Sequence, residues 1–101
     1  MTIYSANAWS DGVKLNVWSK ARTIPGINPA LERLDRCGAR IRWSDYGDRS
    51  ADNNEGWEID HIIPVSKGGT DALSNLQPLH WKNNLAKSDN PSSNYCVVSA
   101  K

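Results

Sequence analysis

The chain has 101 residues, the length of one compact domain, and a domain of this size buries only about 60–65% of the surface that its unfolded chain exposes, so we do not expect a second domain. With 39% hydrophobic residues, 23% charged residues and a formal net charge of +1, the composition is that of a folded globular protein and excludes a disordered chain. A membrane span needs about 18 consecutive apolar residues, and no apolar run in this sequence is close to that length. The N-terminus also lacks the pattern of a secretory signal, so we expect a cytoplasmic protein with no membrane partner.

The first part of the chain carries signals for two short helices. Asp11 is a candidate N-cap for a helix over residues 13–21, in which the apolar residues at i, i+4 and i+8 share one face. An Asn-Pro pair at residues 28–29 is typical of a helix start and predicts a second helix over residues 30–37. Two short helices are therefore expected before the main motif.

The rest of the chain alternates between strand and loop signals. In chain order the predicted elements are a strand over 39–43, a polar loop over 44–56, a strand over 57–63, a glycine-containing loop over 67–74, a short strand over 76–79 and a helix over 80–86. The last four form a compact ββα unit, which can place groups from three elements around one point. We therefore expect a single small α+β domain over residues 1–101 with its core motif at 57–89, in which the five Trp and three Tyr residues supply the aromatic packing.

Charge is distributed unevenly. Residues 14–42 hold seven Lys and Arg against two Asp and Glu, a net +5, whereas residues 43–60 hold one Arg against six acidic residues, a net −5. A basic segment can lie along nucleic acid phosphates, but it can equally be a solvated face, and the charge count leaves both open. Cys37 and Cys96 lie far apart without C-x-x-C spacing, so we expect reduced thiols rather than a disulfide framework or a four-ligand zinc cluster.

Asp60 and His61 place a carboxylate next to an imidazole on a predicted strand, and Asn84 follows on the predicted helix. Carboxylate and amide oxygens suit a hard cation such as Mg²⁺. Cutting a phosphodiester needs a base for the attacking water and positive charge at the leaving oxygen. Because neighbouring strand residues project to opposite faces, Asp60 could act through the cation and His61 through the water. An Asp-His pair alone is also a common structural hydrogen bond, so this pair alone leaves both functions open.

The surrounding residues resemble the HNH nuclease motif. The resemblance covers residues 57–89, which read WEIDHIIPVSKGGTDALSNLQPLHWKNNLAKSD. The matching positions are the pair Asp60-His61, then Ile63-Pro64, Lys67-Gly68-Gly69, Asn75-Leu76, Asn84 and the closing Lys87-Ser88-Asp89. The closing residues also look like those of the HNH domain of RNA-guided CRISPR effectors. A looser similarity to small stand-alone bacterial and phage HNH proteins extends over most of residues 17–90.

This resemblance implies a ββα-metal fold that hydrolyses DNA with one divalent cation per site, Mg²⁺ first and Mn²⁺, Ni²⁺ or Zn²⁺ as alternatives. The implied roles are His61 as general base, Asp60 and Asn84 as metal ligands, Asn75 as a brace that keeps the imidazole oriented, and Lys82 and Lys87 as phosphate contacts. Asn75 also has a rationale of its own, because its amide can bond backbone groups across the loop of residues 64–74.

Many HNH proteins carry a structural zinc held by two C-x-x-C pairs. The matching positions in this chain are Leu34, Cys37, His80 and Asn83, of which only two are good zinc ligands where four are needed. We therefore expect no structural zinc and a structural role for His80, with packing by residues such as Leu34, Trp43 and Trp81 holding the region instead.

Two other functions remain compatible with the sequence. One is a DNA- or partner-binding module that keeps the HNH fold without catalysis, although Asp60, His61, Asn75 and Asn84 are all present. The other is a nuclease directed at RNA. We expect a monomer or weak dimer, and because one chain has one such centre, a double-strand break would need a dimer or two visits.

Overall fold

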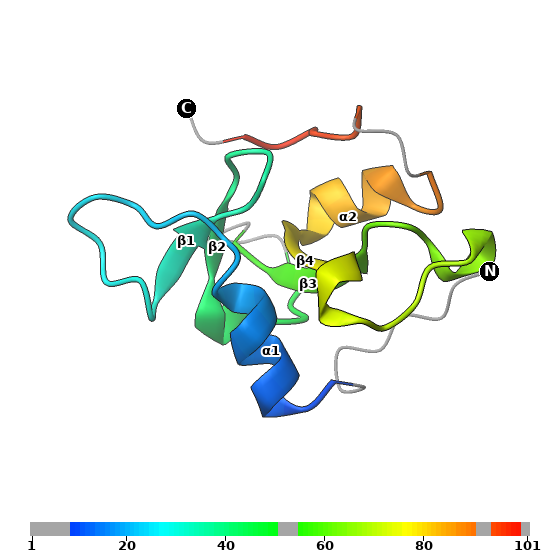
Figure 1. Cartoon of the computed structure of the whole chain (residues 1–101). Coiled ribbons are helices and arrows are strands. Elements are labelled where there is room, and N and C mark those ends of the chain that lie inside the picture. The colour runs from blue at the N-terminus through cyan, green and yellow to red at the C-terminus, as the bar shows by residue number, and fades with distance from the viewer. Residues whose placement is uncertain (1–8, 51–54, 91–93, 100–101) are drawn as a thin grey trace.

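The computed structural model describes residues 9–50, 55–90 and 94–99 (Figure 1). Its helices and strands are α1 (Asp11–Trp18), β1 (Glu32–Leu34), β2 (Arg40–Arg42), β3 (Trp57–His61), β4 (Leu76–His80) and α2 (Trp81–Lys87). β1 pairs with β2 and β3 pairs with β4, both antiparallel. The fold is α+β with a ββα unit over β3, β4 and α2, as predicted. Within the described ranges, no helix is long and apolar enough to cross a membrane.

α1 begins earlier and ends earlier than the helix predicted over residues 13–21. Its N-cap is Ser10 rather than Asp11, because the Ser10 hydroxyl accepts a hydrogen bond from the Val13 N–H at 3.2 Å. Asp11 instead lies in the first helical turn and pairs with Lys14. The helix ends at Trp18, and Ala21 packs in the core from the segment that follows.

The second predicted helix, over residues 30–37, is wrong. Asn28 does cap a single turn, with its Oδ1 accepting from the Ala30 N–H, but the chain then enters β1. The cause is Asp35, whose Oδ1 accepts the N–H groups of Cys37 and Ala39 at 2.9 Å each and so turns the chain back into β2. Such side-chain hydrogen bonds to nearby backbone offer an alternative to the helix.

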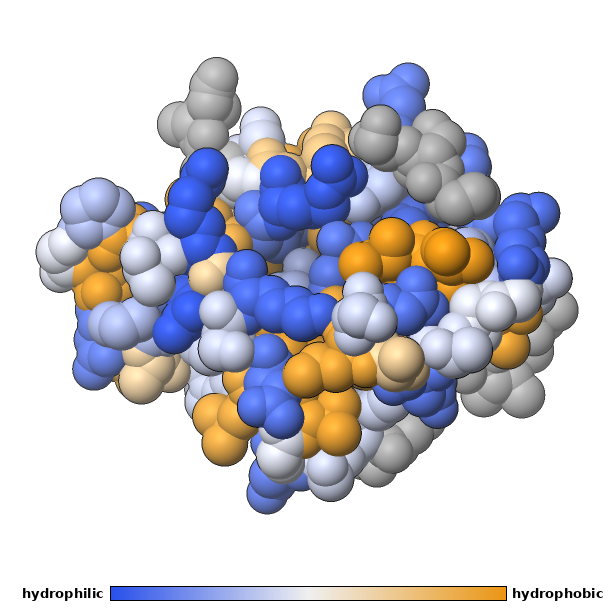
Figure 2. Space-filling view, viewed as in Figure 1, coloured by the Kyte–Doolittle hydropathy of each residue, from blue (hydrophilic) through white to orange (hydrophobic). Residues whose placement is uncertain are grey.

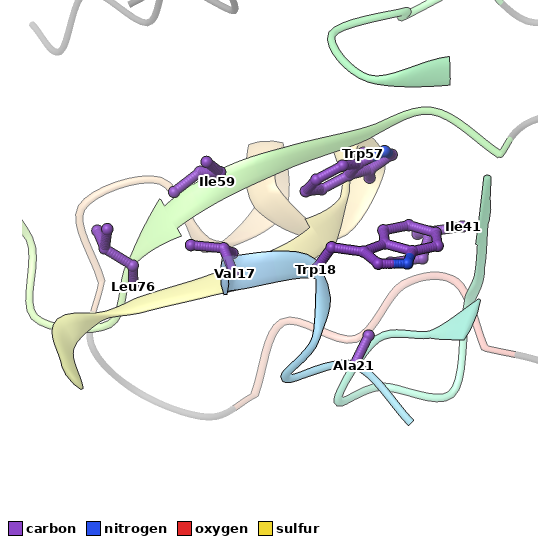
Figure 3. Packing of buried hydrophobic residues seen from close by; sticks show 7 residues of the cluster. All are labelled: Val17, Trp18, Ala21, Ile41, Trp57, Ile59 and Leu76. Atoms are coloured by element: carbon purple, nitrogen blue, oxygen red, sulfur yellow. The ribbon is translucent and has the colours of Figure 1, made fainter. Parts of the chain in front are cut away.

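The β3–β4 hairpin separates the hydrophobic core from α2. α1 and α2 lie on opposite sides of the hairpin (Figure 1), and the core fills the α1 side. Figure 3 shows Trp57 of β3 close to Trp18 of α1, in the cluster that also contains Ile59 and Val17. The Trp18 and Trp57 ring centroids are 5.0 Å apart, so tryptophans form the centre of the core. The predicted strands over 39–43, 57–63 and 76–79 are present with shifted ends, and of the loop predicted over 44–56, residues 51–54 lie outside the described residues.

Cys37 and Cys96 form a disulfide, so the prediction of reduced thiols is wrong. Their Cα atoms lie 5.4 Å apart although 59 positions separate them in the sequence. The C-terminal segment reaches Cys37 because it runs beside α2, where Asn83 Oδ1 accepts the N–H groups of Val97 and Val98 at 2.8 and 2.9 Å. The sequence gives no sign of this return, since the tail has neither helical nor strand periodicity.

Several exposed hydrophobic residues belong to the loop between β3 and β4, and others lie elsewhere along the chain. On the face seen in Figure 2, they form separate patches between hydrophilic side chains. The large apolar residues with the highest exposure include Leu15, Val65, Leu85 and Val97. Scattered apolar residues of this kind are ordinary for a globular domain.

Candidate active site

The end of β3 directs two adjacent side chains in different directions. Asp60 faces α2, as does Glu58 two residues before it, because side chains alternate along a strand. His61, the last residue of β3, instead contacts Trp9 and the loop that leads to β4. The carboxylate and the imidazole therefore belong to two separate sets of neighbours.

Asp60 is buried and bound on both oxygens. Its Oδ1 lies 3.2 Å from the Lys87 ammonium, and its Oδ2 accepts from Gln77 Nε2 at 2.9 Å. Burial raises the pKa of Asp60, and the hydrogen bond from Gln77 and the charge of Lys87 partly offset that rise. Each carboxylate oxygen has about two lone-pair directions, so these two contacts leave acceptor capacity on Asp60.

Lys87 lies inside the protein, with only 2% of its side chain exposed. Besides Asp60, its ammonium donates to the His61 carbonyl oxygen at 2.8 Å. This position does not fit the phosphate contact predicted for Lys87, because its ammonium already binds the Asp60 carboxylate and the His61 carbonyl oxygen. Lys82 is half-buried, with its ammonium 5.5 Å from the centroid of the Trp81 ring.

His61 is held by a residue that sequence reasoning missed. Its Nε2 lies 2.7 Å from Asp71 Oδ1, and the imidazole is 23% exposed. If the neutral ring donates from Nε2, the free lone pair is on Nδ1. Asp71 lies ten residues after His61 in a polar loop, and no spacing rule would have singled it out.

Asn75 ties together the loop between β3 and β4. Its Oδ1 accepts from the Ile63 N–H at 2.8 Å, while its Nδ2 donates to the carbonyl oxygens of Ile63 and Thr70 at 3.1 and 2.8 Å. The predicted hydrogen bonds across this loop are thereby confirmed. Gly69 is part of the same arrangement, since a Cβ there would lie 1.6 Å from the Ile63 carbonyl oxygen.

Asn84 and Glu58 form a second polar cluster between β3 and α2. Asn84 Nδ2 donates to Glu58 Oε1 at 2.8 Å, and Arg49 makes two hydrogen bonds to the Glu58 carboxylate, at 2.6 and 2.8 Å. Sequence reasoning missed both partners. Glu58 could have been found, because it shares a strand face with Asp60, whereas Arg49 lies in a loop without a recognisable pattern.

Three of the four positions that match the zinc-binding pairs, Cys37, His80 and Asn83, are hydrogen-bonded to Asp35. Its Oδ2 accepts from the His80 N–H at 2.9 Å and from Asn83 Nδ2 at 3.1 Å. His80 is fully buried and its Nδ1 accepts from the Lys82 N–H, while Cys37 is held in the disulfide. Among the residues that the structure describes, no group of three or more His, Cys, Asp or Glu side chains could hold a metal ion.

One family model matches this chain. It is described as HNH endonuclease and covers residues 35–90, which is more than half of the chain and includes β2, β3, β4 and α2. The comparisons with curated proteins and with solved structures found no match. The matched segment contains Asp60, His61, Asn75 and Asn84.

Proposed function

Because the chain belongs to the HNH endonuclease family, a family of nucleases, we propose that it hydrolyses phosphodiester bonds in DNA with the help of a divalent cation, Mg²⁺ first. The observation that carries the proposal is the divergence of Asp60 and His61 at the end of β3, one toward α2 and the other toward the loop. A cation ligand and a base that leave adjacent positions in different directions can approach one phosphate from two sides.

Asp60 and Asn84 are the residues proposed to hold the cation. They offer a carboxylate oxygen from β3 and an amide oxygen from α2, and a hard cation that keeps several waters needs few protein oxygens. When bound, the cation would stabilise the negative charge that develops on the leaving oxygen. Lys87 keeps Asp60 and the backbone of His61 in a fixed relation, since one ammonium binds both.

His61 is the proposed general base. With Nε2 donating to Asp71, its Nδ1 would accept a proton from the attacking water. Asn75 supports this arrangement through the backbone, because it joins Ile63 to Thr70, the residue before Asp71. Lys82 and the basic segment of residues 14–42 are the proposed contacts to DNA phosphates.

Cleavage of supercoiled plasmid tests this function. We expect nicking that needs a divalent cation and stops with EDTA, and we expect His61→Ala to lower the rate by about 100-fold or more, the scale of a general base. Ser99→Ala, an exposed change in the C-terminal segment and outside every proposed contact, serves as the control and should cleave at the wild-type rate. Undiminished cleavage by His61→Ala would show that His61 is not the base.

Two parallel measurements separate the other functions. DNA binding by the wild-type protein without cleavage under any cation would indicate a binding module, and faster cleavage of a matched RNA would indicate an RNA nuclease. The oligomeric state, expected to be a monomer or weak dimer, is measured on the same sample. A monomer with one centre would nick a strand before any double-strand break.

A further inference from the structure

Glu58 is a buried carboxylate that the proposed reaction does not use. It is 1% exposed, although charged side chains are seldom fully buried unless they are paired. It lies on the same face of β3 as Asp60 and below α2, which carries Asn84. A buried charge that shares a strand face with one proposed metal ligand and is hydrogen-bonded to the other needs a function.

The hydrogen bond between Glu58 and Asn84 fixes the orientation of the Asn84 side-chain amide. A carboxylate only accepts hydrogen bonds, so Glu58 Oε1 selects the NH₂ end of Asn84, 2.8 Å away. The amide oxygen of Asn84 is then directed away from Glu58. Only that oxygen can bind a cation, because an amide NH₂ group has no lone pair to offer.

Both oxygens of Glu58 are already engaged. Oε2 accepts from Arg49 Nε at 2.6 Å, and Oε1 accepts from Arg49 Nη2 at 2.8 Å as well as from Asn84. The two parallel bonds of the guanidinium give the carboxylate a fixed orientation. Three of the about four lone-pair directions of Glu58 are thus occupied, against two for Asp60, so Glu58 is better suited than Asp60 to orient Asn84 and less suited to bind a cation itself.

We propose that Glu58, held by Arg49, is a positioning residue that keeps the Asn84 amide oxygen turned toward the divalent cation. This inference rests on the proposed function, since it needs Asn84 to be a metal ligand. Groups that orient metal ligands typically change metal affinity by about 10–100-fold when they are removed. Glu58 would therefore act on cation binding through Asn84.

The test is a double-mutant cycle on Mn²⁺ affinity, measured by titration calorimetry on metal-free protein without DNA. We expect Glu58→Leu to weaken Mn²⁺ binding about 10-fold in the wild-type background and to have no further effect in Asn84→Ala. A loss of the same size in both backgrounds would overturn the inference, because Glu58 would then act independently of Asn84, as a ligand of its own.

A conservative variant keeps the test decisive if Glu58→Leu folds poorly. Glu58→Gln retains an oxygen at the Oε1 position but turns an NH₂ group toward Arg49 Nε, so we expect only a few-fold loss of Mn²⁺ affinity. The Asn84 side-chain NH₂ signals, assigned by their absence in Asn84→Ala, should shift in both Glu58 variants. Unchanged signals, or an affinity loss with Gln as large as with Leu, would contradict the inference.

Glu32→Leu is the matched control. Glu32 also pairs with arginine, through Arg40 at 2.7 Å, but it lies on β1 in the other sheet, and its removal should leave Mn²⁺ affinity unchanged. The same titrations distinguish a failure of the proposed metal site from a failure of the proposed role of Glu58. If Asn84→Ala does not weaken Mn²⁺ binding, the metal assignment fails and this inference fails with it; if Asn84→Ala weakens it and Glu58→Leu does not, only this inference fails.

Discussion

Lys87 has a different role from the phosphate contact that its residue type suggests. A lysine at the end of a nuclease motif predicts a phosphate contact, yet this ammonium lies between the Asp60 carboxylate and the His61 carbonyl. Its aliphatic stem and its charge are both inside the fold. The residue type is read from the sequence and its helix can be predicted. The direction of its side chain, however, depends on tertiary packing, which residue spacing alone does not specify.

We expect Lys87→Met to lower the free energy of unfolding by about 3 kcal/mol at neutral pH, because it leaves the Asp60 carboxylate buried without its cation. The loss should shrink in mild acid, where Asp60 can take up a proton. Urea denaturation at both conditions measures this. Lys82→Met is the control, since Lys82 lies over the Trp81 ring and its loss should cost no more than about 0.5 kcal/mol. Equal losses for the two variants would exclude a special role for Lys87.

Asp60 should also determine how metal binding depends on pH. Burial raises the pKa of Asp60 above that of an ordinary aspartate, and only the ionised carboxylate binds a cation well. As the pH falls, Mn²⁺ affinity should therefore begin to drop at a higher pH than an unperturbed aspartate would give. Calorimetric titrations over a pH series measure this, and an affinity that holds constant down to the ordinary aspartate range would contradict it.

At the scale of elements, periodicity predicted the ββα unit and missed the first hairpin. β3, β4 and α2 carry clear apolar patterns and lie close to the predicted ranges. Residues 30–37 have a helix-start signal as well, but Asp35 competes for the backbone N–H groups and its carboxylate also binds the His80 N–H. That second contact spans 45 positions of sequence, and no local pattern contains it.

The loop between β3 and β4 depends on a glycine that no other residue can replace without movement. In Gly69→Ala the new Cβ would overlap the Ile63 carbonyl oxygen, so we expect a loss of about 1–3 kcal/mol in unfolding free energy and slower plasmid cleavage. Gly12→Ala is the control, because a Cβ there would lie no closer than 4.0 Å to the Ser10 Oγ atom and alanine favours the helix. If the two variants are equally stable, the close approach at Gly69 does not constrain the loop.

At the scale of the molecule, the disulfide joins the C-terminal segment to the turn between β1 and β2. The site residues could be predicted from the sequence because they share one motif. The Cys37–Cys96 disulfide could not, because it forms only when the C-terminal segment packs beside α2. Disulfides are typical of oxidising compartments, so this bond speaks against the cytoplasmic location expected from the sequence. Alkylation of free thiols in a fresh extract would report the redox state in the cell.

Reduction should destabilise the protein. Closing a loop of this length restricts the unfolded chain, and the chain-entropy relation gives about 4 kcal/mol, with about 2–4 kcal/mol typical of measured cases. We expect a reductant to lower the melting temperature by roughly 10 °C or more. In buffer without added divalent cation, where the proposed catalytic site is empty, EDTA without reductant should leave it unchanged, since no structural zinc is expected. A drop with EDTA alone would reveal a structural metal, and a Cys37→Ser, Cys96→Ser double variant should no longer respond to reductant.

The same bond alters what a single cut in the backbone can do. A protease that cleaves once within residues 62–75, where many side chains are exposed, would produce two fragments with Cys37 in one and Cys96 in the other. The fragments would stay one covalent molecule and migrate as such in a denaturing gel until a reductant is added. Nicked protein would therefore retain β4 and α2 against β3, and proteolytic damage in the loop between β3 and β4 would go unnoticed unless the sample were reduced.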